Sequence, residues 1–472
     1  MGQPERLVST PYVAHGNVDM NESNFPINAD TLHRAVKMAL DSGEAKTIEE
    51  AYALFSTYCV GVHVGEEART SAAHQAALLS IVNAGRRTLL GGVFVAGALD
   101  APLLVPALFG GQTLGQAVEG MGGFTSPPPD AAPTLLVGTP NLSRGAGTTL
   151  LRLTFNDWAG GVAPPDHSRL SERSGAVLGA VLAAGIALSE VFQHLRDGGR
   201  AGHRICGISA WSPAGDWRDD TLPPLSIVPS RLWVLGLGHL GQAFLWTLAL
   251  LVQGTASQPL VLLHDFDELK PANDSTSLLI DSKAGGMKTR VVAQRLEAVG
   301  LCTRIVERAF DGSEHLQADD PRVAFCGVDN GPTRAMLDRV GFSLVVEAGL
   351  GNGDREYNAL RLHTFPASRA ASTYWSTQED AQVRLDADAY RDLQEKGMDA
   401  CGLVQLATRS VGVPFVGLVA TALALGEMCR ALIDAPRFEL IDLSLRDPTA
   451  ACAVPLDAGP IGNPGYFVRA TT

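Results

Sequence analysis

Three glycines, Gly236, Gly238 and Gly241, follow an apolar run in the sequence LWVLGLGHLGQAFLW. A glycine-rich turn between a strand and a helix lets backbone N–H groups at the helix N-terminus approach phosphate oxygens, because no Cβ atoms stand in the way. In a chain with 50 glycines the G-x-G-x-x-G spacing says little alone, but a strand before it and a helix after it are the context that such a loop needs. The loop predicts a nucleotide site.

Charged side chains follow where a bound nucleotide would need them. Asp265, with Asp267 beside it, ends the next apolar run, and a carboxylate there can accept hydrogen bonds from both ribose hydroxyls. Lys288 opens a helix-like segment and would neutralise phosphate charge, while Asp329 follows another strand-like run and would bind Mg²⁺. Their structural alternatives are a solvated helix residue for Lys288 and a helix N-cap for Asp329. Together they favour Mg²⁺-ATP over the NAD of a dehydrogenase.

The elements that must position these residues alternate between strand and helix. Short connections between them predict right-handed βαβ crossovers and a doubly wound, mainly parallel, Rossmann-like α/β sheet. The expected strands are 231–236, 259–267, 302–310, 322–328, 342–349 and 357–365, with helices at 286–300 and 331–341.

The first half of the chain has a similar texture without a comparable glycine loop. Residues 30–63 show a helical pattern, with Thr47 three residues before Glu50 as a capping-box signal. A long apolar helix-like segment at 175–199 leads into a strand-like run at 204–213, and the proline-rich stretch 213–229 predicts a linker. Further apolar runs typical of an α/β layer cover 88–97, 102–111, 133–138 and 150–155.

Two segments repeat each other. Residues 187–195 (ALSEVFQHL) and 424–432 (ALGEMCRAL) each end an apolar helix rich in small residues, and a strand-like run follows each. The matched order predicts that the halves are copies of one fold, of which only the second holds a nucleotide. The alternative is that two buried helices use alanine and leucine independently.

Composition excludes other classes of protein. The 472 residues suffice for about two or three domains, and 46% hydrophobic with 18% charged residues excludes a disordered chain. A net charge of −13 argues against nucleic acid as the main partner. Seven cysteines without a C-x-x-C pair predict neither a disulfide framework nor a structural zinc. Without an apolar signal sequence, and with glycines interrupting the apolar stretch 232–254, we expect a cytoplasmic protein with no membrane span.

Five segments occur in an order known from one enzyme superfamily: GLGHLG, HDFDELKPAN, GGMKTR, GVDNGPTR and CGLVQLATRSVGVPFVGLVATALALGEM. From about residue 229 onward the chain resembles the ThiF/MoeB and ubiquitin-activating enzyme superfamily. The resemblance implies adenylation of the C-terminal glycine of a ubiquitin-like or sulfur-carrier protein, with ATP and Mg²⁺, and a conjugating enzyme as a further partner. The one-chain, zinc-free form is similar to bacterial ubiquitin-like conjugation systems associated with antiviral defence.

The resemblance implies the ribose role for Asp265, the phosphate role for Lys288 and metal binding for Asp329. Asn273 falls on the asparagine of the family's N-x-x-R-Q segment.

The chain departs from the family immediately after that asparagine. Thr276 and Ser277 stand where the family has arginine and glutamine. Either another basic residue substitutes, with Arg290 or an arginine of a partner subunit as candidates, or catalysis is weakened.

The resemblance also places Cys401 where family members carry the cysteine that takes the acyl group from the adenylate. A thiolate attacks a mixed anhydride readily. A buried structural thiol is the alternative, and the other six cysteines are expected in the core. The polar segment 367–400 is expected to be a crossover loop over the carrier's tail, or else a solvated insertion.

These expectations divide the chain into an N-terminal helical segment (1–75), a degenerate adenylation-like domain (76–222) and an active, ATP-binding adenylation domain (223–472). The halves would pair within one chain as a pseudo-dimer, or between chains as a dimer. The alternatives are an NAD-dependent oxidoreductase with the same glycine loop, a catalytically weak nucleotide-binding scaffold, and adenylation of a small molecule, peptide or tRNA base.

Overall fold

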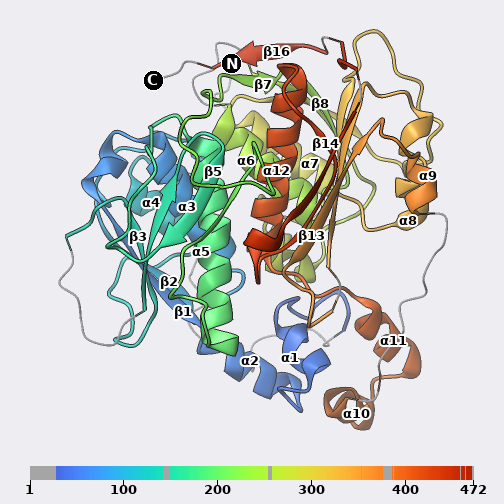
Figure 1. Cartoon of the computed structure of the whole chain (residues 1–472). Coiled ribbons are helices and arrows are strands. Elements are labelled where there is room, and N and C mark those ends of the chain that lie inside the picture. Colours follow the sequence, from blue (N-terminus) through green and yellow to red (C-terminus); the bar gives the residue numbers. More distant parts are fainter. Residues whose placement is uncertain are drawn as a thin grey trace, which may run out of the picture.

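The computed structural model contains two large sheets with helices between and around them (Figure 1). It describes residues 28–141, 149–252, 258–351, 353–375, 385, 387–457, 459–462 and 464–469.

The first sheet has six strands in the order β2-β1-β3-β4-β5-β6. Its first four strands run parallel, and β5 and β6 are antiparallel to their neighbours. The strands are β1 (Cys59–Val64), β2 (Gly92–Gly97), β3 (Thr134–Val137), β4 (Leu150–Phe155), β5 (Ala159–Ala163) and β6 (Cys206–Ser209). The helices of this half are η1 (Glu66–Arg69), α3 (Ala72–Gly85), α4 (Leu114–Gly120) and α5 (Val177–Asp197).

The second sheet has eight strands in the order β10-β9-β8-β11-β12-β13-β14-β15, parallel from β10 to β12 and antiparallel beyond. The strands are β8 (Arg231–Leu235), β9 (Leu260–His264), β10 (Cys302–Val306), β11 (Val323–Cys326), β12 (Leu344–Leu350), β13 (Ala359–Phe365), β14 (Phe438–Ser444) and β15 (Cys452–Pro455). The α-helices are α6 (His239–Leu251), α7 (Lys288–Glu297), α8 (Gly331–Arg334), α9 (Ala371–Tyr374), α10 (Asp388–Glu395), α11 (Ala400–Thr408) and α12 (Pro414–Leu432). Short 3₁₀ helices are η2 (Pro271–Ser275), η3 (Ser282–Ala284), η4 (Leu337–Arg339) and η5 (Pro448–Ala450), and β7 (Ile227–Pro229) pairs with β16 (Tyr466–Val468).

Six strands of the second sheet repeat the order of the first. The segment β9-β8-β11-β12-β13-β14 of the second sheet has the same order as β2-β1-β3-β4-β5-β6 of the first. In both, the last two strands, β13 and β14 or β5 and β6, run antiparallel to their neighbours. A long apolar helix precedes the sixth strand in both, α5 before β6 and α12 before β14. The predicted fold class, a doubly wound and mainly parallel α/β protein of two related halves, is confirmed. The second half adds α9, α10 and α11 between its fifth strand and its long helix.

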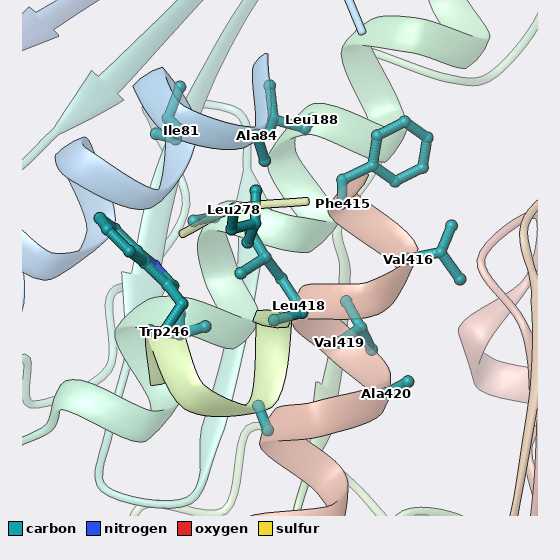
Figure 2. Packing of buried hydrophobic residues seen from close by; sticks show 14 of the residues in the cluster. Ile81, Ala84, Leu188, Trp246, Leu278, Phe415, Val416, Leu418, Val419 and Ala420 are labelled. Carbon is teal, nitrogen blue, oxygen red and sulfur yellow. The ribbon is translucent and has the colours of Figure 1, made fainter. Parts of the chain in front are cut away.

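The halves pack on each other through α5 and α12, which lie side by side at the centre of the molecule (Figure 1). Figure 2 shows Leu188 of α5, Trp246 of α6 and Phe415 of α12 in one apolar cluster. Gly185 permits the close approach, because a Cβ there would lie 2.6 Å from Val419 Cγ2. Both long helices are apolar enough to cross a membrane by length and composition, but they are buried like the core helices of a globular protein.

The repeat extends to buried charges. Glu190 and Glu427 occupy matching places in the two repeated segments, and both are fully buried. Glu190 pairs with Arg204 and Glu427 with Arg430, and each carboxylate also accepts a backbone N–H. Paired in this way, neither carboxylate is left as an uncompensated buried charge.

The N-terminal segment differs in part from the prediction. It forms α1 (Val36–Ser42) and α2 (Ile48–Ser56), and Thr47 caps α2 by accepting the N–H of Glu50, as predicted. The expected helical pattern is wrong from residue 59, where β1 begins, because valines at alternate positions bury one face of a strand in the first sheet. The first sheet therefore starts before the expected boundary at residue 75. The apolar run 102–111 forms no strand, since its two prolines cannot donate to a ladder.

Candidate nucleotide site

The glycine loop joins β8 to α6 in a conformation that needs glycine. Gly236 has φ +83°, and a Cβ on Gly241 would lie 1.8 Å from the Gly236 carbonyl oxygen. Within the described part of the chain, no group accepts a hydrogen bond from the N–H of Gly238, His239 or Leu240. Free N–H groups at a helix N-terminus are the donors that phosphate oxygens use. The geometry therefore fits a phosphate-binding loop.

Asp265 lies at the carboxyl end of β9, buried against this loop. One carboxylate oxygen accepts the N–H of Leu237 at 2.6 Å, and the other accepts the N–H of Asp267 at 2.8 Å. The sequence did not reveal this bracing role. Each oxygen keeps a second lone pair, so the predicted bond to a ribose hydroxyl stays compatible with the geometry.

Lys288 is the first residue of α7 and is 6% exposed, so it is not a solvated helix residue. Its Nζ lies 2.6 Å from Asp267 Oδ2, and its backbone N–H bonds to the Asp267 carbonyl. Asp267 is itself half exposed. The pair holds an ammonium group against Asp267, two residues after the Asp265 that braces the glycine loop, and an incoming phosphate would compete with this exposed carboxylate for the ammonium.

Asp329 follows β11, at the same edge of the sheet. The N-cap of α8 is Asn330, whose side chain accepts the N–H of Thr333 at 2.9 Å, so the N-cap interpretation of Asp329 is wrong. Asp329 is exposed and makes no hydrogen bond or ion pair within the described residues. A free carboxylate at the carboxyl edge of a parallel sheet suits Mg²⁺.

The segment that departs from the family is held by the first half of the chain. Asn273 Oδ1 accepts the N–H of Lys270, the N-cap of η2, at 2.8 Å. Thr276 and Ser277 are buried, and the Ser277 hydroxyl has no partner among the described residues. Arg87, next to α3, donates to the carbonyl oxygens of Asp274 and Ile280.

Arg290, one candidate for the missing arginine, is engaged elsewhere. It pairs with Glu307 at 2.7 Å on the exposed side of α7.

Arg34 is a site residue that sequence reasoning missed. It precedes α1, and its Cβ lies 3.8 Å from the place where a Cβ on Gly412 would stand, while Thr276 Cγ2 lies 2.9 Å from the same point. Burial and the charge of Arg409 lower the pKa of Arg34 to about 10, and the charge of Asp329 opposes that shift. The half-buried Arg34 thus packs with Thr276 around Gly412, and its charge interacts with that of Asp329. No local motif marks Arg34, so only the fold could reveal it.

The matching place in the first half is filled by protein groups. Strand register makes Ala98 the counterpart of Asp265. Glu67 turns its carboxylate to the N–H of Thr139 at 3.1 Å, near the start of α3, where it would repel a phosphate. The first N–H groups of α3 are already taken by Ser174 and Ser71. This arrangement supports the expectation that only the second half holds a nucleotide.

Cys401 is exposed at the second residue of α11, whose N-cap is Asp399. Burial as a structural thiol is therefore excluded for Cys401. The expectation that the other cysteines lie in the core is wrong for Cys302 and Cys452, which begin β10 and β15 and are exposed, because both strands lie at edges of the second sheet. The fully buried thiols are Cys206, Cys326 and Cys429, with Cys59 half-buried.

The start of the expected crossover segment covers the sheet edge beside Asp329. Trp375 follows α9 and lies against Gly331, and the guanidinium of Arg334 stands 5.8 Å from the centre of its ring. Residues 376–384 and 386 of this segment lie outside the described residues.

Comparisons with known proteins agree with the two-part fold. Residues 59–210 match the BilD N-terminal domain family and residues 228–435 the BilD C-terminal domain family. The bacterial E1-like protein BilD of Collimonas sp. (strain OK412) is 45% identical over 429 residues, 89% of this chain and 92% of that protein. Among solved structures, Escherichia coli MccB with succinimide is 14% identical over 49% of this chain and 65% of its own length, with a TM-score of 0.32. The tRNA N6-threonylcarbamoyladenosine dehydratase TcdA of E. coli, in complex with ATP, is 15% identical over 43% of this chain and 87% of its own, with a TM-score of 0.27.

Proposed function

The chain belongs to the BilD family of bacterial E1-like proteins, and on this premise we propose that it adenylates the C-terminal carboxylate of a ubiquitin-like or sulfur-carrier protein. A carboxylate oxygen of the carrier attacks the α-phosphorus of ATP, an acyl–O–P bond forms, and pyrophosphate leaves with the electrons of the broken P–O bond. One observation carries the proposal: the free N–H groups of the glycine loop stand at one sheet edge with Asp265, Lys288 and Asp329.

Each residue of that edge has a task in the proposed reaction. The loop N–H groups bind phosphate oxygens, Asp265 orients the ribose, and Lys288 leaves Asp267 to neutralise charge that grows on the leaving group. Arg34 supplies the positive charge that Thr276 cannot. Asp329 would hold Mg²⁺, which when bound neutralises phosphate charge.

Cys401 is the proposed acceptor of the acyl group. Its thiol loses a proton to solvent, the sulfur attacks the acyl carbon of the adenylate, a C–S bond forms, and AMP leaves as the acyl–oxygen bond breaks. Its exposure at the start of α11 supports this role. A conjugating enzyme would then take the acyl group, in a cytoplasmic ubiquitin-like conjugation system of the kind associated with antiviral defence.

The test is ATP–pyrophosphate exchange by the purified chain, with and without a candidate ubiquitin-like carrier, beside the Asp329→Ala variant. We expect exchange that depends on the carrier and is lost in Asp329→Ala. A Cys401→Ala variant should keep exchange and lose a thiol-sensitive carrier adduct. Nucleotide binding without exchange for any carrier would overturn the proposal in favour of a nucleotide-binding scaffold, and hydride transfer to NAD in favour of an oxidoreductase.

A further inference from the structure

The helix that carries Cys401, α11, and the helix before it, α10, both contact the N-terminal segment. We call α10 and α11 the Cys401 helix pair; Figure 1 shows it at the same end of the molecule as α1 and α2. The hydroxyl of Tyr390, on α10, donates to Asp41 Oδ1 at 2.6 Å. Lys37 Nζ donates to Asp41 Oδ2 at 2.5 Å and to the carbonyl of Ala407, on α11, at 3.3 Å. Asp41 of α1 thus binds α10, and Lys37 of α1 binds α11.

This network is buried, which makes it more than a surface contact. Lys37 and Tyr390 are each 2% exposed, and the Asp41 side chain is 17% exposed. Removing the charge of Asp41 would leave a buried ammonium without its counterion, a strongly unfavourable change. By contrast, Lys396 pairs with Glu49 of α2 through side chains that are both about half exposed, and such pairs contribute little.

The same N-terminal segment reaches the nucleotide site at its other end. The carbonyl of Asp30 accepts the N–H of Ala272, next to Asn273, at 2.8 Å. The Asp30 carboxylate lies 3.3 Å from Arg409, directly after α11. Arg34, four residues on, packs with Thr276 around Gly412. Residues 30–41 are therefore one short stretch that touches the nucleotide site, the exit of α11 and the Cys401 helix pair.

Cys401 makes no hydrogen bond to the glycine loop or to Asp329 among the described residues, and it stands at the start of α11, the end far from Arg409. Arg409 lies eight residues after Cys401, which along α11 corresponds to about 12 Å. The polar neighbour of the Cys401 sulfur in the described structure is Gln405, not a residue of the glycine loop or Asp329. We infer that transfer from an adenylate to this thiol needs a shift of the helix pair, and α1 contacts both of its helices.

We propose that α1 is a clamp on the Cys401 helix pair, closed through Asp41 and Lys37 and tightened when a nucleotide binds beside Arg34. The proposal rests on the proposed function for the place of the nucleotide and the role of the thiol. A ligand that fixes Arg34 restrains residues 30–41 and therefore also the network at Asp41. Because such coupling is reciprocal, release of the Cys401 helix pair weakens nucleotide binding.

Asp41→Asn tests the clamp. Lys396→Ala is the control, because it breaks the pairs that the half-exposed Lys396 makes with Glu49 of α2 and with Asp392 of α10 and leaves the contacts of α1 intact. Without nucleotide, we expect Asp41→Asn to speed amide hydrogen exchange in residues 388–408, and alkylation of Cys401 by N-ethylmaleimide, about tenfold. Lys396→Ala should stay within about twofold of the wild-type chain, and the exposed Cys302 and Cys452 give reference rates. If Asp41→Asn fails to fold, Tyr390→Phe, which removes one hydroxyl, takes its place. Unchanged exchange and alkylation in the folded variant would overturn the clamp.

A non-hydrolysable ATP analogue with Mg²⁺ tests the coupling. It should slow exchange in residues 388–408 of the wild-type chain at least threefold and have no such effect in Asp41→Asn. Equal slowing in both chains, or an analogue that binds without slowing, would overturn the coupling. Pyrophosphate exchange separates the two proposals. If the wild-type chain shows the clamp and the coupling but no carrier-dependent exchange, the proposed function is refuted and the clamp is retained.

Discussion

The carboxylate of Asp265 accepts the backbone N–H of Leu237 at 2.6 Å, so the end of β9 fixes the glycine loop that follows β8. The residue expected to bind ribose thus also shapes the glycine turn that we propose binds phosphate. The loop geometry and the proposed ribose recognition would both depend on this one buried side chain.

Asp265→Asn should weaken ATP binding by about tenfold or more. The amide keeps one oxygen acceptor but loses the charge that strengthens its bond to a backbone N–H, a difference of about 1.5 kcal/mol or more. Calorimetric titration with an ATP analogue measures the effect. Wild-type affinity in a folded variant would remove Asp265 from the site.

Gly241→Ala should abolish nucleotide binding in a chain that still folds. A Cβ there would meet the Gly236 carbonyl oxygen at 1.8 Å, so the turn must open. Gly459→Ala is the control, because nothing lies within 4 Å of its Cβ position. Binding is measured as above, and circular dichroism checks the fold. Equal affinity in the two variants would contradict a phosphate role for the loop.

Arg34→Ala should raise the ATP requirement of pyrophosphate exchange by roughly ten- to a hundredfold, the loss expected for a charge-assisted bond to phosphate. Arg290→Ala should change it less than about twofold, because Arg290 serves an exposed pair with Glu307. The comparison shows whether Arg34, Arg290 or neither takes over the role of the family arginine, whose position Thr276 occupies in this chain.

Acid should destabilise the chain through buried imidazoles. Burial lowers the pKa of His33, His239 and His264 to about 4, and His264 Nδ1 accepts the indole N–H of Trp233. In the unfolded chain these imidazoles bind protons below about pH 6.5. In the folded chain the same imidazoles stay neutral until about pH 4. Stability therefore falls as the pH drops from 6.5 to 4 and levels off below for these groups.

Urea titrations at several pH values measure this slope. His264→Gln should reduce the proton uptake on unfolding near pH 5 by about one. An unchanged uptake would contradict the neutral imidazole.

Glu427→Ala should lower the free energy of unfolding by about 3–5 kcal/mol, because the buried guanidinium of Arg430 would lose its counterion. Both side chains are fully buried at the end of α12. Asp442→Ala, which breaks the exposed pair with Arg361, should cost less than about 1 kcal/mol. Chemical unfolding compares the two, and similar losses would refute the role of burial.

Local sequence determined most strands of the second half and its helices α6, α7 and α12, whereas the segment 367–400, expected as a loop, contains α9 and α10. The glycine spacing at 236–241, the alternation of apolar runs with helical periods, and Thr47 before Glu50 each reflect interactions within a few residues, so they are readable from the chain itself. The repeat at Glu190 and Glu427 was visible for the same reason. The positions of Asp265, Lys288 and Asp329 at strand ends and a helix start followed from topology, since parallel strands bring those ends to one edge.

Tertiary structure alone decided what depends on contacts between distant segments. The local pattern predicted a helix through residue 63, but residues 59–64 form strand β1 because the first sheet buries them. Tertiary context here overrides local propensity. Arg34 lies more than two hundred residues from Thr276, and Asp41 about 350 from Tyr390, so neither relation leaves a local pattern. The fold was also needed to show that the Asp329 carboxylate is free. The side chain of Asn330, not that of Asp329, caps α8, and this leaves Asp329 open to a ligand.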